Sequence, residues 1–175
     1  MVSKRDQYCI FEFKIELLMK KFSIAIHGGA GTLVKGLMTQ ELEAQYKKAL
    51  KVARDAGFEV LENGGSALDA VETSVKLLEN SPLFNAGKGS VFTAEGTHEM
   101  DAAIMEGKNL EAGAVSLITG IKNPVSLARD VMEKSYHVFL AGDGAMQFAK
   151  GLDYEVERPD YFYDEVRYKQ CHLYG

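Results

Sequence analysis

Two glycine-rich loops have the residue types and spacing best suited to lining a binding site. The first, residues 28–31, reads Gly-Gly-Ala-Gly and follows a short apolar run. The second, residues 83–90, reads Leu-Phe-Asn-Ala-Gly-Lys-Gly-Ser. Glycine lets a backbone turn with positive φ and approach another group closely, so such loops can present main-chain amides and carbonyls to a ligand. Tight turns that bind nothing explain the same glycines, and the spacing alone does not identify a ligand.

Phosphate binding does not fit either loop. The dinucleotide fingerprint needs Gly-x-Gly-x-x-Gly at the opening of a helix, but Val34 stands where the third glycine belongs. The phosphate-binding loop of nucleotide hydrolases needs Ser or Thr after Gly-Lys. Here Gly89 follows Lys88, and Pro82 replaces the first glycine. We therefore do not expect a nucleotide or any other organic cofactor.

Side chains that bind metals or act as nucleophiles are scattered along the chain. The histidines at positions 27, 98, 137 and 172 show neither His-x-His nor His-x-x-x-His spacing, so a structural role is favoured for each. Cys9 and Cys171 are far apart, which favours two free thiols in a reducing compartment and predicts a cytoplasmic location. The sequence has no Gly-x-Ser-x-Gly nucleophile elbow.

Composition narrows the class of protein further. The 175 residues are 46% hydrophobic and carry a net charge of −5, which is typical of a globular domain and leaves no basic excess for nucleic acid. Apolar runs are shorter than the roughly 18 residues that cross a membrane, so we expect no membrane association. Charged residues at 12, 14 and 16 interrupt any signal-like segment, and residues 1–21 are interpreted as an N-terminal extension.

Hydrophobic periodicity predicts the elements that hold these loops. An apolar run at 22–27 predicts a strand, and apolar residues at helical spacing predict helices on either side of Gly64-Gly65. Ser66 followed by Asp69 predicts a helix start with a capping box. Asn80-Ser81-Pro82 ends that helix before the second glycine loop.

The second half of the chain predicts a hairpin and two further helices. Segments 99–105 and 110–119 read as strands joined by a turn, Asn123-Pro124 opens a helix, and 136–141 is a strand before a helix that ends near Gly151. Residues 152–175 have little periodicity, which predicts an irregular linker or tail. Strands grouped around a hairpin favour an α+β fold with helices on the outer faces of layered sheets, and exclude a doubly wound nucleotide fold.

Six blocks of sequence, in order, resemble the signatures of one family. They lie at residues 26–31, 63–71, 82–92, 99–107, 112–116 and 123–133. The chain is identified by them as a member of the plant-type L-asparaginases, also called isoaspartyl peptidases, among the N-terminal-nucleophile hydrolases. The resemblance covers about residues 22–150.

The resemblance implies a four-layer αββα sandwich, of which this chain is the α-subunit half with its core at 22–151. It also implies a precursor that cuts itself before a Thr, which becomes the first residue of a β subunit. That Thr carries its own base, because a free α-amine with a pKa of about 8 can accept the hydroxyl proton. The expected substrates are L-asparagine and β-aspartyl (isoaspartyl) dipeptides, and the expected assembly is (αβ)2.

The resemblance also assigns site residues. Asn85 is implied to support the nucleophile region, although an Asn that stabilises its own turn explains it too. A glycine loop near the cleavage site is implied at His27, Gly28, Gly29, Ala30 and Gly31. A structural sodium or potassium ion is implied, held by the main-chain carbonyls of Leu78, Glu79, Ser81, Phe84, Ala86 and Lys88.

The chain departs from the family pattern at one point, because no threonine in it begins the Thr-Val-Gly run expected of the β subunit. Gly175 matches the residue before the expected autocleavage site, whereas residues 167–170 resemble a point from which relatives run further. Native processing at Gly175 and an early end both remain open. The alternative function is a truncated, inactive α-like domain that serves as a structural or interaction module.

Overall fold

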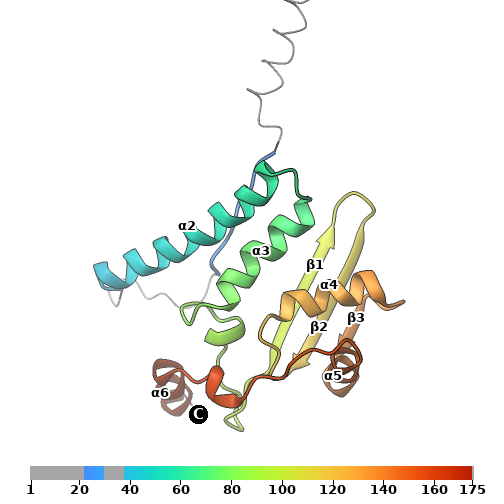
Figure 1. Cartoon of the computed structure of the whole chain (residues 1–175). Coiled ribbons are helices and arrows are strands. Elements are labelled where there is room, and N and C mark those ends of the chain that lie inside the picture. Colours follow the sequence, from blue (N-terminus) through green and yellow to red (C-terminus); the bar gives the residue numbers. More distant parts are fainter. Residues whose placement is uncertain (1–21, 30–37, 175) are drawn as a thin grey trace, which may run out of the picture.

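The computed structural model describes residues 22–29 and 38–174. Its elements, in chain order, are α2 (Gln40–Glu62), α3 (Ala67–Glu79), the 3-10 turn η1 (Gly87–Gly89), β1 (Met100–Glu106), β2 (Glu111–Ile118), α4 (Pro124–Lys134), β3 (Phe139–Ala141), α5 (Gly142–Gly151), the 3-10 turn η2 (Pro159–Tyr161) and α6 (Glu165–Tyr174). Figure 1 shows α2 and α3 as a pair beside the sheet, with α4 lying across the strands.

Side-chain caps start the two long helices. The Thr39 hydroxyl accepts the Leu42 N–H at 3.2 Å. Ser66 Oγ accepts the Asp69 N–H at 3.0 Å, and the Asp69 carboxylate accepts the Ser66 N–H at 3.2 Å. The predicted capping box at Ser66 is therefore confirmed.

Gly57 permits the close packing of α2 on α3. A Cβ at this position would lie 2.7 Å from the Ala70 carbonyl oxygen, which no real side chain tolerates. The Ser74 hydroxyl donates to the Ala53 carbonyl at 2.9 Å across the same contact. Backbone-to-backbone packing of this kind makes the two helices one rigid support for the loop that follows α3.

The sheet among the described residues has the order β1-β2-β3. β1 and β2 are antiparallel, with Ala103 opposite Ala114, and β2 and β3 are parallel. The predicted hairpin is therefore confirmed. A bulge in β1 places the Asp101 carboxylate against β2, where it accepts the Leu117 N–H at 3.0 Å and the Ser116 hydroxyl at 2.6 Å.

One face of the sheet is covered by helices. Ile104 and Val115 are buried beneath Leu127 and Val131 of α4. Gly113 brings α4 directly onto β2, because a Cβ there would lie 2.6 Å from the Met132 nitrogen. The core of the described chain lies between this face and α4, with α5 packed beside it.

No described residue covers the opposite face of the sheet. Ala103 and Met105 of β1 and Phe139 and Ala141 of β3 are exposed there, Met105 to 60% and Phe139 to 56%. The described residues thus form a mixed α/β unit with one small sheet. The four-layer sandwich stays a prediction.

Residues 22–29 do not form the predicted strand. The segment lies against α2 instead, with the Phe22 ring 5.3 Å from the Phe58 ring and Ile24 beside Gly57. An apolar run becomes a strand only where a sheet edge offers backbone partners, and β1, β2 and β3 are not paired with this segment in the structure. The prediction of a strand at 22–27 is therefore wrong for this structure.

The tail at 152–175 is not irregular throughout, because residues 165–174 form α6. The Asp164 carboxylate accepts the N–H groups of Val166 and Arg167 at 3.0 Å each, which starts the helix. The Lys169 ammonium pairs with the Glu165 carboxylate at 3.0 Å, one turn apart. Capping and charge pairing form this helix, whereas its weak apolar periodicity hid it from prediction.

Candidate functional site

The structure brings the first glycine loop next to the second. A Cβ on Gly28 would lie 3.2 Å from the Phe84 ring and 3.0 Å from Leu50 of α2. Tyr46 of α2 fixes the same loop, because its hydroxyl donates to the Leu83 carbonyl at 2.9 Å and its ring stands edge-on to Phe84 at 5.6 Å. Two predicted site segments therefore meet on one face of α2.

Asn85 is exposed and holds its own loop. Its Oδ1 accepts the N–H of Val91, six residues later, at 3.0 Å. The role in stabilising the loop is thus present in the structure. That bond uses one lone pair of Oδ1, so Asn85 can offer a ligand its Nδ2 donor and the second lone pair of Oδ1.

His27 also bonds within its own turn. Its Nδ1 accepts the Gly29 N–H at 3.1 Å, and Gly29 has φ of 100°. Only glycine adopts that backbone conformation readily, so the loop depends on it. Ala30, Gly31 and Gly175, which were also predicted site residues, lie outside the described residues.

The loop between α3 and η1 presents main-chain carbonyls to its own glycines. A Cβ at Gly87 would overlap the Glu79 carbonyl oxygen, and one at Gly89 would overlap the Phe84 carbonyl oxygen. Gly87 also has φ of 52°. These carbonyls pack directly against the two glycines, so a side chain at either position would displace the loop backbone.

The predicted cation ligands are partly used within this loop. The carbonyls of Leu78, Phe84 and Ala86 accept N–H bonds at 3.1, 2.9 and 3.1 Å. Each carbonyl keeps a second lone pair, and hard cations take oxygen ligands of this kind, so the donor set fits a monovalent ion. In the described part of the chain no three His, Cys, Asp or Glu side chains gather as a metal site.

Sequence reasoning missed the side chain of Glu79, which is 2% exposed. Its carboxylate accepts the Val125 N–H at 2.9 Å and the Asn123 amide at 3.1 Å. Burial raises the pKa of Glu79 to about 7. The predicted helix start at Asn123 is correct, but the oxygen that caps α4 comes from α3.

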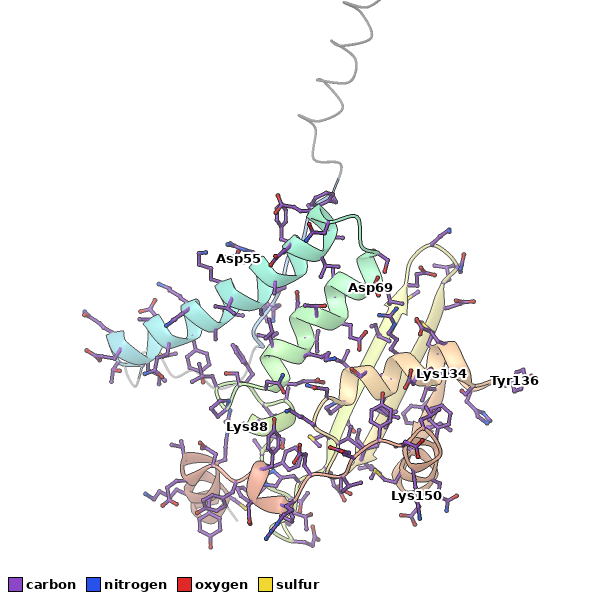
Figure 2. All side chains as sticks on the ribbon, viewed as in Figure 1. Asp55, Asp69, Lys88, Lys134, Tyr136 and Lys150 are labelled. Atoms are coloured by element: carbon purple, nitrogen blue, oxygen red, sulfur yellow. The ribbon has the colours of Figure 1, made fainter. Side chains whose placement is uncertain are left out.

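Arg129 is a second residue whose role was missed. Its guanidinium donates to the carboxylates of Asp69 at 2.8 Å and Glu72 at 2.7 Å on α3, and to Glu133 at 2.8 Å on α4. Figure 2 shows Asp69 at the start of α3, facing the strands and α4. Arg129 thus ties the helix that leads into the loop to the helix that covers the sheet.

Comparison with known proteins decides the family. The family model described as asparaginase (Asparaginase_2) matches residues 20–173. The chain belongs to this asparaginase family. The predicted membership is confirmed, and the matched residues include both glycine loops.

Curated relatives of this asparaginase family chain are about half identical to it. An isoaspartyl peptidase of Salmonella typhimurium is 47% identical over 87% of this chain and 49% of its own length. A plant-type L-asparaginase of Thermococcus kodakarensis is 52% identical over 78% of this chain and 43% of its own. An isoaspartyl peptidase/L-asparaginase of Xenopus laevis is 53% identical over 73% and 40%.

This asparaginase family chain spans less than half the length of those relatives. None of the helices that the structure describes is both long and apolar enough to cross a membrane.

Proposed function

We propose that the chain is the α part of an isoaspartyl peptidase/L-asparaginase that hydrolyses L-asparagine and β-aspartyl dipeptides. Family membership and the names of the relatives support the reaction class. The observation that carries the proposal is the sheet face that no described residue covers, because it calls for a second part of the enzyme.

That face is mostly apolar, and its polar members Asp101 and Ser116 bond to each other. Antiparallel strands that face water alternate apolar and polar side chains, yet Ala103, Met105, Ala114 and Phe139 lie on the outer side of these strands. A second sheet packed about 10 Å away would bury them. This reasoning supports the proposed αββα sandwich, completed by a β subunit. The proposed (αβ)2 assembly rests on the family resemblance, and the proposed cytoplasmic location rests on the sequence's two widely separated cysteines.

The proposed chemistry begins with autoproteolysis, which frees an N-terminal Thr on the β subunit. The α-amine takes the proton of the Thr hydroxyl, and the oxygen attacks the carbonyl carbon of the substrate's side-chain amide. The carbon–nitrogen bond breaks, and ammonia or the peptide amine leaves with a proton. Water then hydrolyses the ester, releases aspartate and restores the Thr. Asn85 contributes its Nδ2 as a hydrogen-bond donor near the nucleophile.

The carbonyls of Leu78, Glu79, Ser81, Phe84, Ala86 and Lys88 would hold a structural sodium or potassium ion. The ion would supply positive charge that draws these dipoles inward and so fixes the loop that carries Asn85. The loop already holds the carbonyl oxygens of Glu79 and Phe84 against Gly87 and Gly89, and this gathering of main-chain oxygens supports this part of the proposal.

The decisive experiment is intact-mass spectrometry of the protein together with two assays: ammonia release from L-asparagine and amino-acid release from a β-aspartyl dipeptide. We expect a second chain that begins with Thr, and release of ammonia and of the dipeptide's amine product. An uncut species that hydrolyses neither substrate would overturn the proposal and favour an inactive structural module.

A further inference from the structure

The C-terminal part of the chain packs against the loop that carries Asn85. Phe162 is 2% exposed, and its ring lies 5.8 Å from the imidazole of His98. The Tyr161 ring lies 5.4 Å from the Lys88 ammonium; Figure 2 shows Lys88 below α3, close to η2. The segment therefore contacts the chain at Lys88 and at His98, both of which follow Asn85.

Phe92 is the residue on which these contacts converge. Its ring lies 4.2 Å from the His98 ring on one side. Tyr163 and Tyr168 meet it edge-on at 6.0 and 5.7 Å. Edge-to-face contacts between aromatic rings are favourable and directional, so Phe92 is held in one orientation between the imidazole and the two tyrosines.

The backbone next to Phe92 holds the Asn85 side chain. The N–H of Val91 donates to Asn85 Oδ1 at 3.0 Å. Ser90, on the other side of Val91, is held by its hydroxyl, which lies 3.1 Å from His98 Nδ1. Both neighbours of Val91 are thus fixed by the aromatic cluster, and the position of the Val91 nitrogen sets where the Asn85 amide lies.

We propose that Tyr163 and Tyr168 are positioning residues that orient Asn85 through Phe92 and Val91. The importance of this orientation rests on the proposed function, in which Asn85 donates a hydrogen bond near the nucleophile. The mechanical link itself is a property of the fold and has its own measurement. Both tyrosine rings contact Phe92, so the effect of changing them travels through the loop backbone.

The test compares three variants of the whole protein. Tyr163→Ala with Tyr168→Ala removes both rings, Tyr163→Phe with Tyr168→Phe keeps the rings without the hydroxyls, and Tyr136→Ala is the control. Tyr163 and Tyr168 are 49% and 41% exposed, so their removal spares the buried core. Tyr136 is fully exposed and points away from the fold at the far side of the molecule (Figure 2).

The readout is hydrogen exchange of the Val91 amide at single-residue resolution, with steady-state kinetics alongside. In the double Ala variant we expect exchange at Val91 to rise about tenfold or more, as the bond to Asn85 opens locally. We expect kcat to fall about tenfold with KM changed less than about twofold, which a general loss of folded protein does not produce at equal active-site concentration. The double Phe variant and Tyr136→Ala should match the wild type.

Unchanged exchange at Val91 in the double Ala variant would overturn the proposal, whatever the kinetics. Faster exchange with an unchanged kcat would overturn the link to the reaction. Loss of exchange protection in the double Phe variant would show that the hydroxyls act instead of the rings, and would overturn the route through Phe92. A wild-type protein without hydrolytic activity would defeat the proposed function, while the exchange data would still decide the mechanical link.

Discussion

The Glu79 carboxylate at the end of α3 accepts the backbone N–H of Val125 in the first turn of α4, at 2.9 Å. The free N–H groups at a helix start need acceptors, and the partial positive charge there favours a carboxylate. One buried side chain therefore joins the helix that leads into the Asn85 loop to the helix that covers the sheet. The main-chain carbonyl of Glu79 lies against Gly87, in the loop that carries Asn85.

Replacing Glu79 with Ala should destabilise the protein by about 1–3 kcal/mol, because the buried Val125 N–H loses its acceptor and the Asn123 amide loses one of its acceptors. Glu79→Gln keeps one acceptor oxygen and most of the side-chain volume, so this variant should lose less stability than Glu79→Ala. Urea denaturation midpoints measure the stability of both variants. Glu59→Ala, at an exposed position of α2, is the control and should change little. An Ala variant as stable as the wild type would contradict the capping role.

Gly89→Ala should lower the free energy of unfolding by about 1–3 kcal/mol through overpacking. A Cβ at Gly89 overlaps the Phe84 carbonyl and lies 2.7 Å from the Pro82 carbonyl, so the loop backbone has to move. Gly107→Ala is the matched control, since nothing lies within 4 Å of a Cβ there. The two variants are compared by thermal unfolding with and without added sodium. Equal melting temperatures for both variants would argue against a tightly packed carbonyl loop.

Asn85→Ala should lower kcat on L-asparagine by about tenfold or more, because the proposed donor to the nucleophile region is removed. Asn109→Ala is the control. Asn109 is exposed in the turn between β1 and β2, where it donates to the Glu106 carboxylate at 3.2 Å. Steady-state kinetics of the two variants decide the matter. Retention of full activity by Asn85→Ala would leave Asn85 as a loop-stabilising residue alone.

Ala103→Lys should block assembly with the proposed β subunit. The change places a charge at the middle of the uncovered apolar face, where burial without a partner is costly. Glu99→Lys, just outside β1, introduces the same side chain at an exposed position and should assemble normally. Size-exclusion chromatography with light scattering distinguishes the complex from free chains. Normal assembly of Ala103→Lys would mean that this face is not the contact.

His98 should make stability fall in mild acid. Burial lowers the pKa of His98 below its ordinary 6.5, so the unfolded chain binds a proton there more readily than the folded chain. The contribution of neutral, buried His98 to the free energy of unfolding is complete above about pH 6.5 and is lost as the pH falls below that value. The difference in unfolding free energy between wild type and His98→Gln, which does not titrate, should shift against the wild type below pH 6.5. A difference that stays constant from pH 5 to 8 would refute this.

Features coded by neighbouring residues were predictable from the sequence. The capping box at Ser66 and the β1–β2 hairpin depend on residues close in the chain, and both are confirmed. The Glu79 cap on α4 was not predictable, because it joins residues 46 apart. At residues 22–27 a strand was predicted that does not form. The apolar composition suits a strand, but a strand also needs the edge of a sheet as its partner.

The candidate site divides in the same way. The glycine pattern located the two loops and the family resemblance assigned roles to them, and the family is confirmed. The hydrogen bond from the Val91 N–H to Asn85 lies within one loop, yet no sequence motif predicts it. Arg129 and the aromatic cluster around Phe92 combine segments from distant parts of the chain, and residue type alone does not reveal such pairings.

The small size of the side chains on the uncovered sheet face has a consequence for any sheet that packs there. Alanines at 103, 112, 114 and 141 give that face little relief, with Met105 and Phe139 as its larger projections. A well-filled interface then needs bulky residues from the partner opposite the alanines and small ones opposite Met105 and Phe139. Most of the side-chain volume at this interface then comes from the partner sheet. A larger side chain on one sheet is tolerated only if a side chain opposite it on the other sheet becomes smaller.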